Sequence, residues 1–125
     1  MRRNNVGGQR IYATSPEVAD IVAISQNIIG IFNDGMDRLN RERMLTDSER
    51  NILYSLPPDS ALQLNYDALS NQTHMLWELA LEKQRSFHNH EVSGPYSIEE
   101  LGNRLIECSQ RWEVWKNRLR DYGSQ

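Results

Sequence analysis

Residues 97–122 carry the strongest structural signal in this chain, and they read SIEELGNRLIECSQRWEVWKNRLRDY. Apolar residues recur here at alternating spacings of three and four. This is the a/d pattern of a heptad repeat, which places its members on one stripe of a helix. The members are Ile98, Leu101, Leu105, Cys108, Trp112, Trp115, Leu119 and Tyr122. The pattern predicts a long helix that packs against other helices.

Two capping boxes mark where helices begin. Ser97 is followed three residues later by Glu100, and Thr46 is followed by Glu49 in the same way. In this motif each side chain bonds the backbone N–H of the other residue. The first box predicts the start of the long helix, and the second predicts the start of a short helix that ends before Pro57, because proline interrupts helices.

The region from Ser15 to about Met44 is predicted to form a second long helix, with two adjacent apolar seams. The first seam comprises Val18, Val22, Ile29, Phe32, Met36 and Leu39, and the second comprises Ile21, Ile24, Ile28 and Ile31. Together they cover about half of the helix circumference, which is more than one neighbouring helix needs. The second seam is therefore expected to contact a second helix or another chain.

A third long helix is predicted to begin after a cap at Asp59 or Ser60. Its apolar residues again follow the three-four alternation: Leu62, Tyr66, Leu69, Thr73, Leu76, Ala80 and Phe87. Trp77 and Leu81 lie off this seam and border the polar face. In a small monomer Trp77 would be partly exposed, so it is a candidate contact for another chain.

These elements predict an all-α protein, since no segment shows the alternation of a strand. The expected architecture is an elongated antiparallel helical bundle of three long helices plus one short helix, with coiled-coil-like packing. A length of 125 residues suits a single domain. We expect this domain to span residues 15–125, preceded by a flexible basic tail at residues 1–14.

Composition limits the classes of function. The net charge is −3, but residues 1–15 contain three arginines and no acid, which leaves −6 for the rest. There is no apolar run of about 18 residues, so no membrane span is predicted. The single Cys108 excludes an intramolecular disulfide and favours a reducing intracellular compartment, either the cytoplasm or the nucleus.

The histidines, the glutamates of the third predicted helix and the single cysteine occur in patterns that structural roles explain. His88 and His90 fall in an expected loop, where two solvated histidines are the simplest interpretation. Glu78 and Glu82 lie on the polar face of a helix, and Cys108 lies on an apolar stripe without an adjacent base. No catalytic residue, cofactor, metal site or small-molecule substrate is predicted. A metal-dependent enzyme built on the loop histidines is the least favoured reading.

The pattern favours a non-catalytic interaction or assembly protein, a subunit or adaptor that self-associates or binds a partner protein through helix faces. The candidate interface residues are Ile24, Ile28, Ile31, Trp77, Leu81, Trp112 and Trp115. For Trp112 and Trp115 the seam position leaves two roles open, a place in the core or an anchor for a partner.

The alternative is a small regulator, for example from a phage or virus, that binds nucleic acid or inhibits a nucleic-acid-processing enzyme. It depends on a basic tail that would contact phosphate through Arg2, Arg3 and Arg10. Arginines at the end of the last helix would add to this contact. So few cations predict weak, salt-dependent binding.

Overall fold

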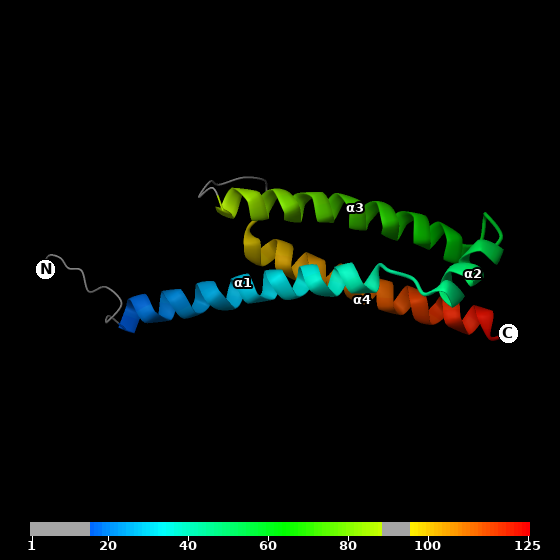
Figure 1. The fold of residues 1–125 in the computed structure, drawn as a ribbon, viewed down its shortest axis with the longest axis horizontal. Coiled ribbons are helices and arrows are strands. Elements are labelled where there is room, and N and C mark those ends of the chain that lie inside the picture. Colours follow the sequence, from blue (N-terminus) through cyan, green and yellow to red (C-terminus); the bar gives the residue numbers. More distant parts are fainter. Residues whose placement is uncertain (1–15, 89–95) are drawn as a thin grey trace, which may run out of the picture.

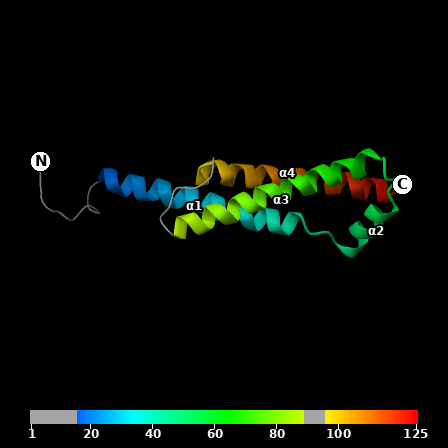
Figure 2. The same ribbon diagram turned by 90° about the horizontal axis from the view of Figure 1, so that it is seen from above.

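A computed structural model describes the backbone of residues 16–88 and 96–125, and the side chains of residues 26–86 and 96–125. These ranges contain four helices and no strand: α1 (Pro16–Glu42), α2 (Asp47–Ser55), α3 (Ala61–His88) and α4 (Ile98–Gly123). They form the predicted elongated bundle (Figure 1). α1 and α4 run in the same direction and α3 runs opposite to both, so successive long helices are antiparallel (Figure 2).

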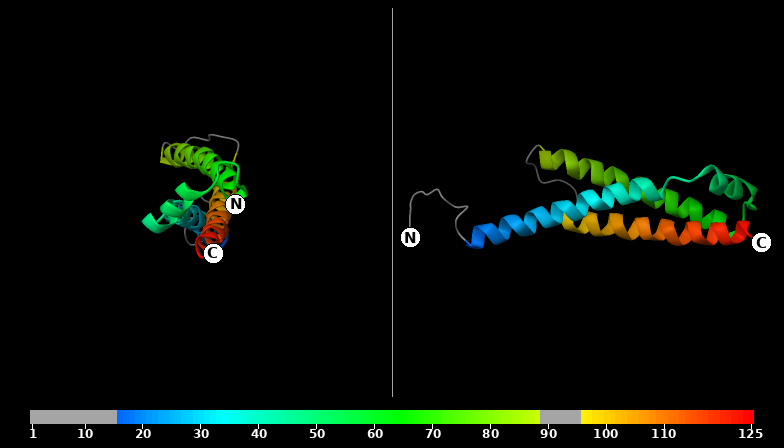
Figure 3. Two further views of the ribbon diagram at one scale, coloured as in Figure 1. Left: turned by 90° about the vertical axis from the view of Figure 1, so that its right-hand side faces the viewer. Right: turned by 60° about the horizontal axis from the view of Figure 1, so that its bottom comes forward.

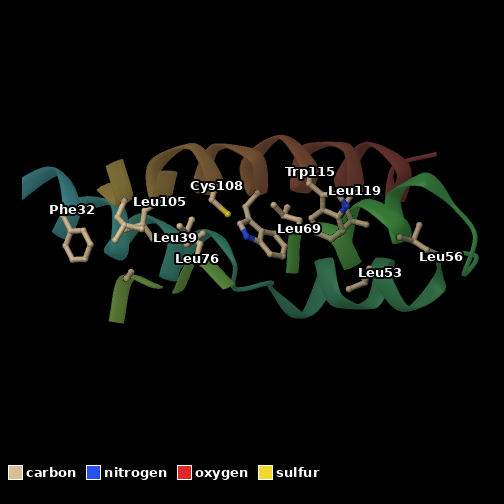
Figure 4. Close-up of a cluster of buried hydrophobic side chains, with 13 residues drawn as sticks. Phe32, Leu39, Leu53, Leu56, Leu69, Leu76, Leu105, Cys108, Trp115 and Leu119 are labelled. Carbon is tan, nitrogen blue, oxygen red and sulfur yellow. The ribbon is translucent and has the colours of Figure 1, made fainter. Parts of the chain in front are cut away.

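α4 is the central element of the bundle. It packs against α1 and α3, and the short α2 contacts its C-terminal end (Figure 3). Six of the eight residues in its predicted seam are buried: Leu101, Leu105, Cys108, Trp112, Trp115 and Leu119. Ile98 is partly buried, and Tyr122 in the last turn is 40% exposed. The seam is thus the main contribution of α4 to the core (Figure 4).

The contact between α1 and α4 depends on two glycines. A Cβ atom built on Gly35 would lie 2.9 Å from the Cβ of Leu105 and 3.0 Å from the carbonyl oxygen of Gly102. A Cβ atom on Gly102 would lie 3.1 Å from the backbone nitrogen of Phe32. The two backbones are therefore as close as glycine permits, and this contact fixes the register of α1 along α4.

The same register leaves the first part of α1 beyond the bundle. Because Phe32 and Gly35 lie beside Gly102, the start of α4 at Ile98 lies beside roughly residue 28 of α1, counting equal rises along both helices. Figures 1 and 3 show α1 continuing past the adjacent ends of α3 and α4. We call residues 16–27 the α1 extension; at 1.5 Å per residue it is about 18 Å long.

The capping boxes confirm two predicted helix starts. The Glu49 N–H donates to Thr46 Oγ1, and the Thr46 N–H donates to Glu49 Oε1, at 3.1 and 2.8 Å. Ser97 and Glu100 make the same pair of bonds at the start of α4. Ser60, one of two candidates for the cap of α3, accepts a bond from the Gln63 N–H.

The two ends of α1 relate differently to the predicted boundaries. α1 ends at Glu42, two residues before the expected Met44, and its expected cap at Ser15 lies outside the described residues. The basic tail also lies outside them. Within the described part of the chain, no helix combines the length and apolar content needed to cross a lipid bilayer.

Candidate interaction surfaces

The two tryptophans of the α4 seam belong to the core of the chain itself. Trp112 is 2% exposed and Trp115 is 4% exposed. Their rings meet edge to face with centroids 5.7 Å apart, and Tyr66 of α3 lies 5.9 Å from the first ring and 5.2 Å from the second. Of the two roles left open by the sequence, the structure shows the core role. α3 covers both rings, so neither ring offers a surface to another chain.

A buried polar cluster lies beside these rings. The Trp112 indole N–H donates to Thr73 Oγ1 at 2.7 Å, and the same oxygen lies 3.3 Å from Cys108 Sγ. Burial raises the pKa of the Cys108 thiol, and the opposing effects of the Thr73 bond and Arg111 are smaller. A buried thiol with a raised pKa is a poor nucleophile. The cluster is therefore a satisfied structural network that joins α3 to α4.

Trp77 is covered in part by Arg43, the residue that follows α1. Its side chain is partly buried, and the Arg43 guanidinium carbon lies 4.7 Å from the centroid of its ring. A ring off the seam that faces α4 thus has a neighbour within the chain. Leu81, one turn further along α3, is also partly buried. This pair offers only a limited surface to another chain.

The second seam of α1 is divided between the bundle and the extension. Ile28 and Ile31 are partly buried, and Ile31 lies against α4, with its Cγ2 3.1 Å from the point where a Gly102 Cβ would lie. The side chain of Ile24 lies outside the described residues. In the sequence, Ile21, Ile24 and Ile28 continue the same spacing into the extension.

The second half of the extension belongs to an uncharged stretch of sequence, whereas its first half contains Glu17 and Asp20. Residues 21–33 read IVAISQNIIGIFN, although a quarter of the whole chain is charged. Helices that face water on all sides carry charged and polar residues around most of their circumference. The α1 extension is therefore the strongest candidate surface for another chain.

A groove between α3 and α4 is a second candidate, which the sequence did not predict. Its volume is about 690 Å³, and its lining includes Ala68, Leu69 and Val114, with Arg111 and Arg118 also contributing. Val114 is 53% exposed. The only sequence signal for it was an apolar Val114 off the seam of α4, and single exposed apolar residues are too common to indicate a site.

Cations at the end of α4 are mostly engaged within the chain. Lys116 pairs with Glu42 at 3.1 Å, Arg120 pairs with Glu49 at 2.6 Å, and Arg111 bonds Gln72 at 2.7 Å. These contacts compete with any contact to phosphate. The tail cations Arg2, Arg3 and Arg10 lie outside the described residues.

Residues 16–88 and 96–125 contain no cluster of three His, Cys, Asp or Glu side chains suited to a metal ion. His74 is exposed, and Glu78 and Glu82 lie on the exposed side of α3. The side chain of His88 and the whole of His90 fall outside the described residues.

The described structure defines the class of this protein as an all-α helical bundle with an α-helical extension. Comparison of the chain with protein-family models, with curated proteins and with solved structures finds no match.

Proposed function

We propose that this chain is a non-catalytic subunit or adaptor of a larger complex, which self-associates or binds a partner protein through helix faces. The observation that carries the proposal is the α1 extension. It is a helix whose backbone leaves the bundle over about a dozen residues, and residues 21–27 of it carry no charge.

The physical reason is that most of the stability of a helix in a protein comes from tertiary packing of its apolar face. The extension is the end of a helix of 27 residues, and a helix end without such packing frays. The extension is rich in Ile and Val, which lose side-chain freedom in a helix. Packing against another chain would supply the stabilisation that the bundle does not provide there.

A non-catalytic role is supported by the character of the groove. Its lining exposes more apolar than polar surface, and its charged residues, Glu107, Arg111 and Arg118, lie along one face of α4. Arg111 already bonds Gln72 across the groove. Such a lining suits packing better than acid–base chemistry. We also propose a reducing compartment, which keeps the buried Cys108 as a thiol.

Two measurements on the purified chain test the proposal: its mass in solution at micromolar concentration, and its retention of proteins from the native source, identified by mass spectrometry. We expect a mass above the 14.6 kDa of one chain, or the specific retention of a different protein. Ile24→Glu should abolish either result, because it places a charge in the extension.

Met75→Glu is the matched control, since Met75 is 66% exposed on α3 and its replacement should leave both results unchanged. Trp77→Asp is a poorer probe, because Trp77 also packs within the chain. A compact monomer that retains no protein, or retains the same proteins with Ile24→Glu, would overturn the proposal.

A further inference from the structure

We propose that the groove between α3 and α4 binds an amphipathic helix of another protein, whose acidic side chains face a row of arginines on α4. This adds a second surface to the proposed function. The groove lies apart from the α1 extension and is formed by side chains of the described bundle, so the two proposals can fail separately.

The groove follows the flank of α4 that faces away from α1. α1 contacts the other flank, where Gly102 lies against Phe32 and Lys116 pairs with Glu42. Counting 100° per residue, Arg118 in the groove lies roughly 160° around α4 from both Gly102 and Lys116. The α4 lining extends over residues 107–118, about three turns or roughly 16 Å. A short stretch of helix fits along this length.

A row of arginines follows the same flank at heptad spacing. Arg104, Arg111 and Arg118 are seven residues apart, and all three are exposed. With Ile98 as the first a position and Leu101 as the first d position, the arginines occupy three successive g positions. In coiled-coil packing the g positions form salt bridges with a neighbouring helix and thereby set the choice of partner.

The neighbouring helix within the chain does not supply the opposite charges. The α3 residues that line the groove are all uncharged: Asn65, Ala68, Leu69 and Gln72. Arg111 bonds the Gln72 amide oxygen at 2.7 Å, and Glu107 of its own helix is 4.0 Å away. Arg118 makes no hydrogen bond or ion pair within the described part of the chain. Two arginines thus line the groove without an acid on α3, and an acidic helix complements them.

The floor and edges of the groove are apolar. Leu69 and Trp115 are almost fully buried at its floor, while Val114 on α4 is 53% exposed and Ala68 on α3 is exposed. A helix with an apolar stripe would cover Val114 and Ala68, and burial of apolar surface favours association. The contact spans only three turns, so we expect weak binding, with a dissociation constant above about 10 μM, as is typical of small transient interfaces.

The buried seams of the bundle favour another protein over a second copy. A helix that enters the groove must present a free apolar stripe with acids beside it. The described seams of α1, α3 and α4 already form one core within the chain, which includes Phe32, Leu39, Leu76 and Leu105. A second copy would have to open its own bundle to offer one of these stripes.

The first test is the binding of two synthetic peptides to the full chain, measured by fluorescence anisotropy. The acidic peptide has three heptads with Leu at a and d and Glu at e and g, so that its own charges repel and keep it from pairing with itself. The matched basic peptide has Lys in place of Glu. We expect the acidic peptide to bind at least about tenfold more tightly, and salt to weaken its binding. Absence of binding, or equal binding of both peptides, overturns the inference.

Substitutions locate the binding site. Arg118→Glu should raise the dissociation constant of the acidic peptide about fivefold, because an exposed attraction becomes a repulsion. Val114→Glu should raise it at least about tenfold, because it places a charge in the apolar contact. Arg41→Glu is the matched control, since Arg41 is exposed on α1 and the change in net charge is the same. Equal effects of Arg118→Glu and Arg41→Glu would show a response to net charge alone and overturn the site.

Two further measurements separate this inference from the proposed function. Circular dichroism should show the same thermal unfolding for all variants, and Ile24→Glu should bind the acidic peptide as the wild type does. Loss of peptide binding in Ile24→Glu would move the site to the α1 extension and overturn the groove. Self-association that weakens with Arg118→Glu would show that a second copy fills the groove and overturn the choice of occupant. A groove that binds neither peptide leaves the test of the α1 extension unaffected.

Discussion

Gly35 and Gly102 determine how closely α1 and α4 approach. Each lacks a side chain at a point where the opposite helix leaves no room for one. Gly30 belongs to the same helix as Gly35, but a Cβ atom there would meet nothing within 4 Å. In the sequence these two glycines of α1 look alike, and only the position of α4 distinguishes them.

This contrast predicts opposite effects of the same substitution. Gly30→Ala should raise the free energy of unfolding by about 0.5–1 kcal/mol, because alanine is the better helix former. Gly35→Ala gains the same helix-propensity contribution to the free energy of unfolding. It also introduces overpacking against α4, which costs about 1–3 kcal/mol. Its net effect should be a loss of about 1–2 kcal/mol. Urea unfolding of both variants measures this difference, and equal stabilisation by the two would contradict the close contact.

At the scale of the element, α2 is held against the end of α4 by a charged contact and a tight apolar one. Glu49 is 4% exposed, caps α2 and accepts a 2.6 Å bond from Arg120. A Cβ atom on Gly123 would lie 2.5 Å from Cδ1 of Ile52, so the two helices are in close contact there. The Thr46–Glu49 capping box therefore begins α2 and also anchors it to α4.

The Glu49 carboxylate makes this contact sensitive to pH. Burial raises its pKa, but the bond from the Thr46 N–H and the cations Lys116 and Arg120 outweigh burial, so the net pKa is lowered. A lowered pKa means that the contact stabilises the fold fully above the ordinary value of about 4.3, and that this stabilisation is lost as pH falls through the lower folded-state value.

We therefore expect the free energy of unfolding to fall between pH 5 and pH 2, and Glu49→Gln to reduce the size of this fall. At pH 7 the substitution should cost about 1 kcal/mol, because Arg120 is half exposed and its pair with Glu49 is screened. Denaturation at a series of pH values provides the test. Identical pH profiles for the two proteins would show that Glu49 does not contribute.

At the scale of the whole molecule, the bundle and the α1 extension are stabilised differently. From roughly residue 28 onward α1 packs on α4, whereas the backbone of residues 16–27 continues past the adjacent end of α4. The boundary between these two parts of α1 is set by where α4 begins.

Hydrogen exchange should reveal this boundary. In the monomeric Ile24→Glu variant, backbone amides of residues 16–27 should exchange at least tenfold faster than those of residues 31–42, because opening them breaks no tertiary contacts. In the wild-type protein at high concentration, assembly should slow exchange in residues 16–27. Exchange that does not change with concentration would argue against assembly through the extension.

The sequence alone determined the helices and most of the core. The three-four spacing identified the stripe from Leu101 to Leu119, because a buried helix face must repeat with the period of the helix. Two capping boxes located the starts of α2 and α4, because both bonds of the motif are local to each segment. These two interpretations needed only one helix and its own side chains, and both were confirmed.

Tertiary structure alone decided which faces meet and which are left over. Trp112 and Trp115 were assigned to the core only once α3 lay over them, and the partial burial of Trp77 was explained only once Arg43 lay over its ring. The groove between α3 and α4 and the length of the α1 extension depend on the relative register of helices far apart in the chain. Periodicity shows which face of a helix is apolar, but it carries no information on how far one helix is shifted along another.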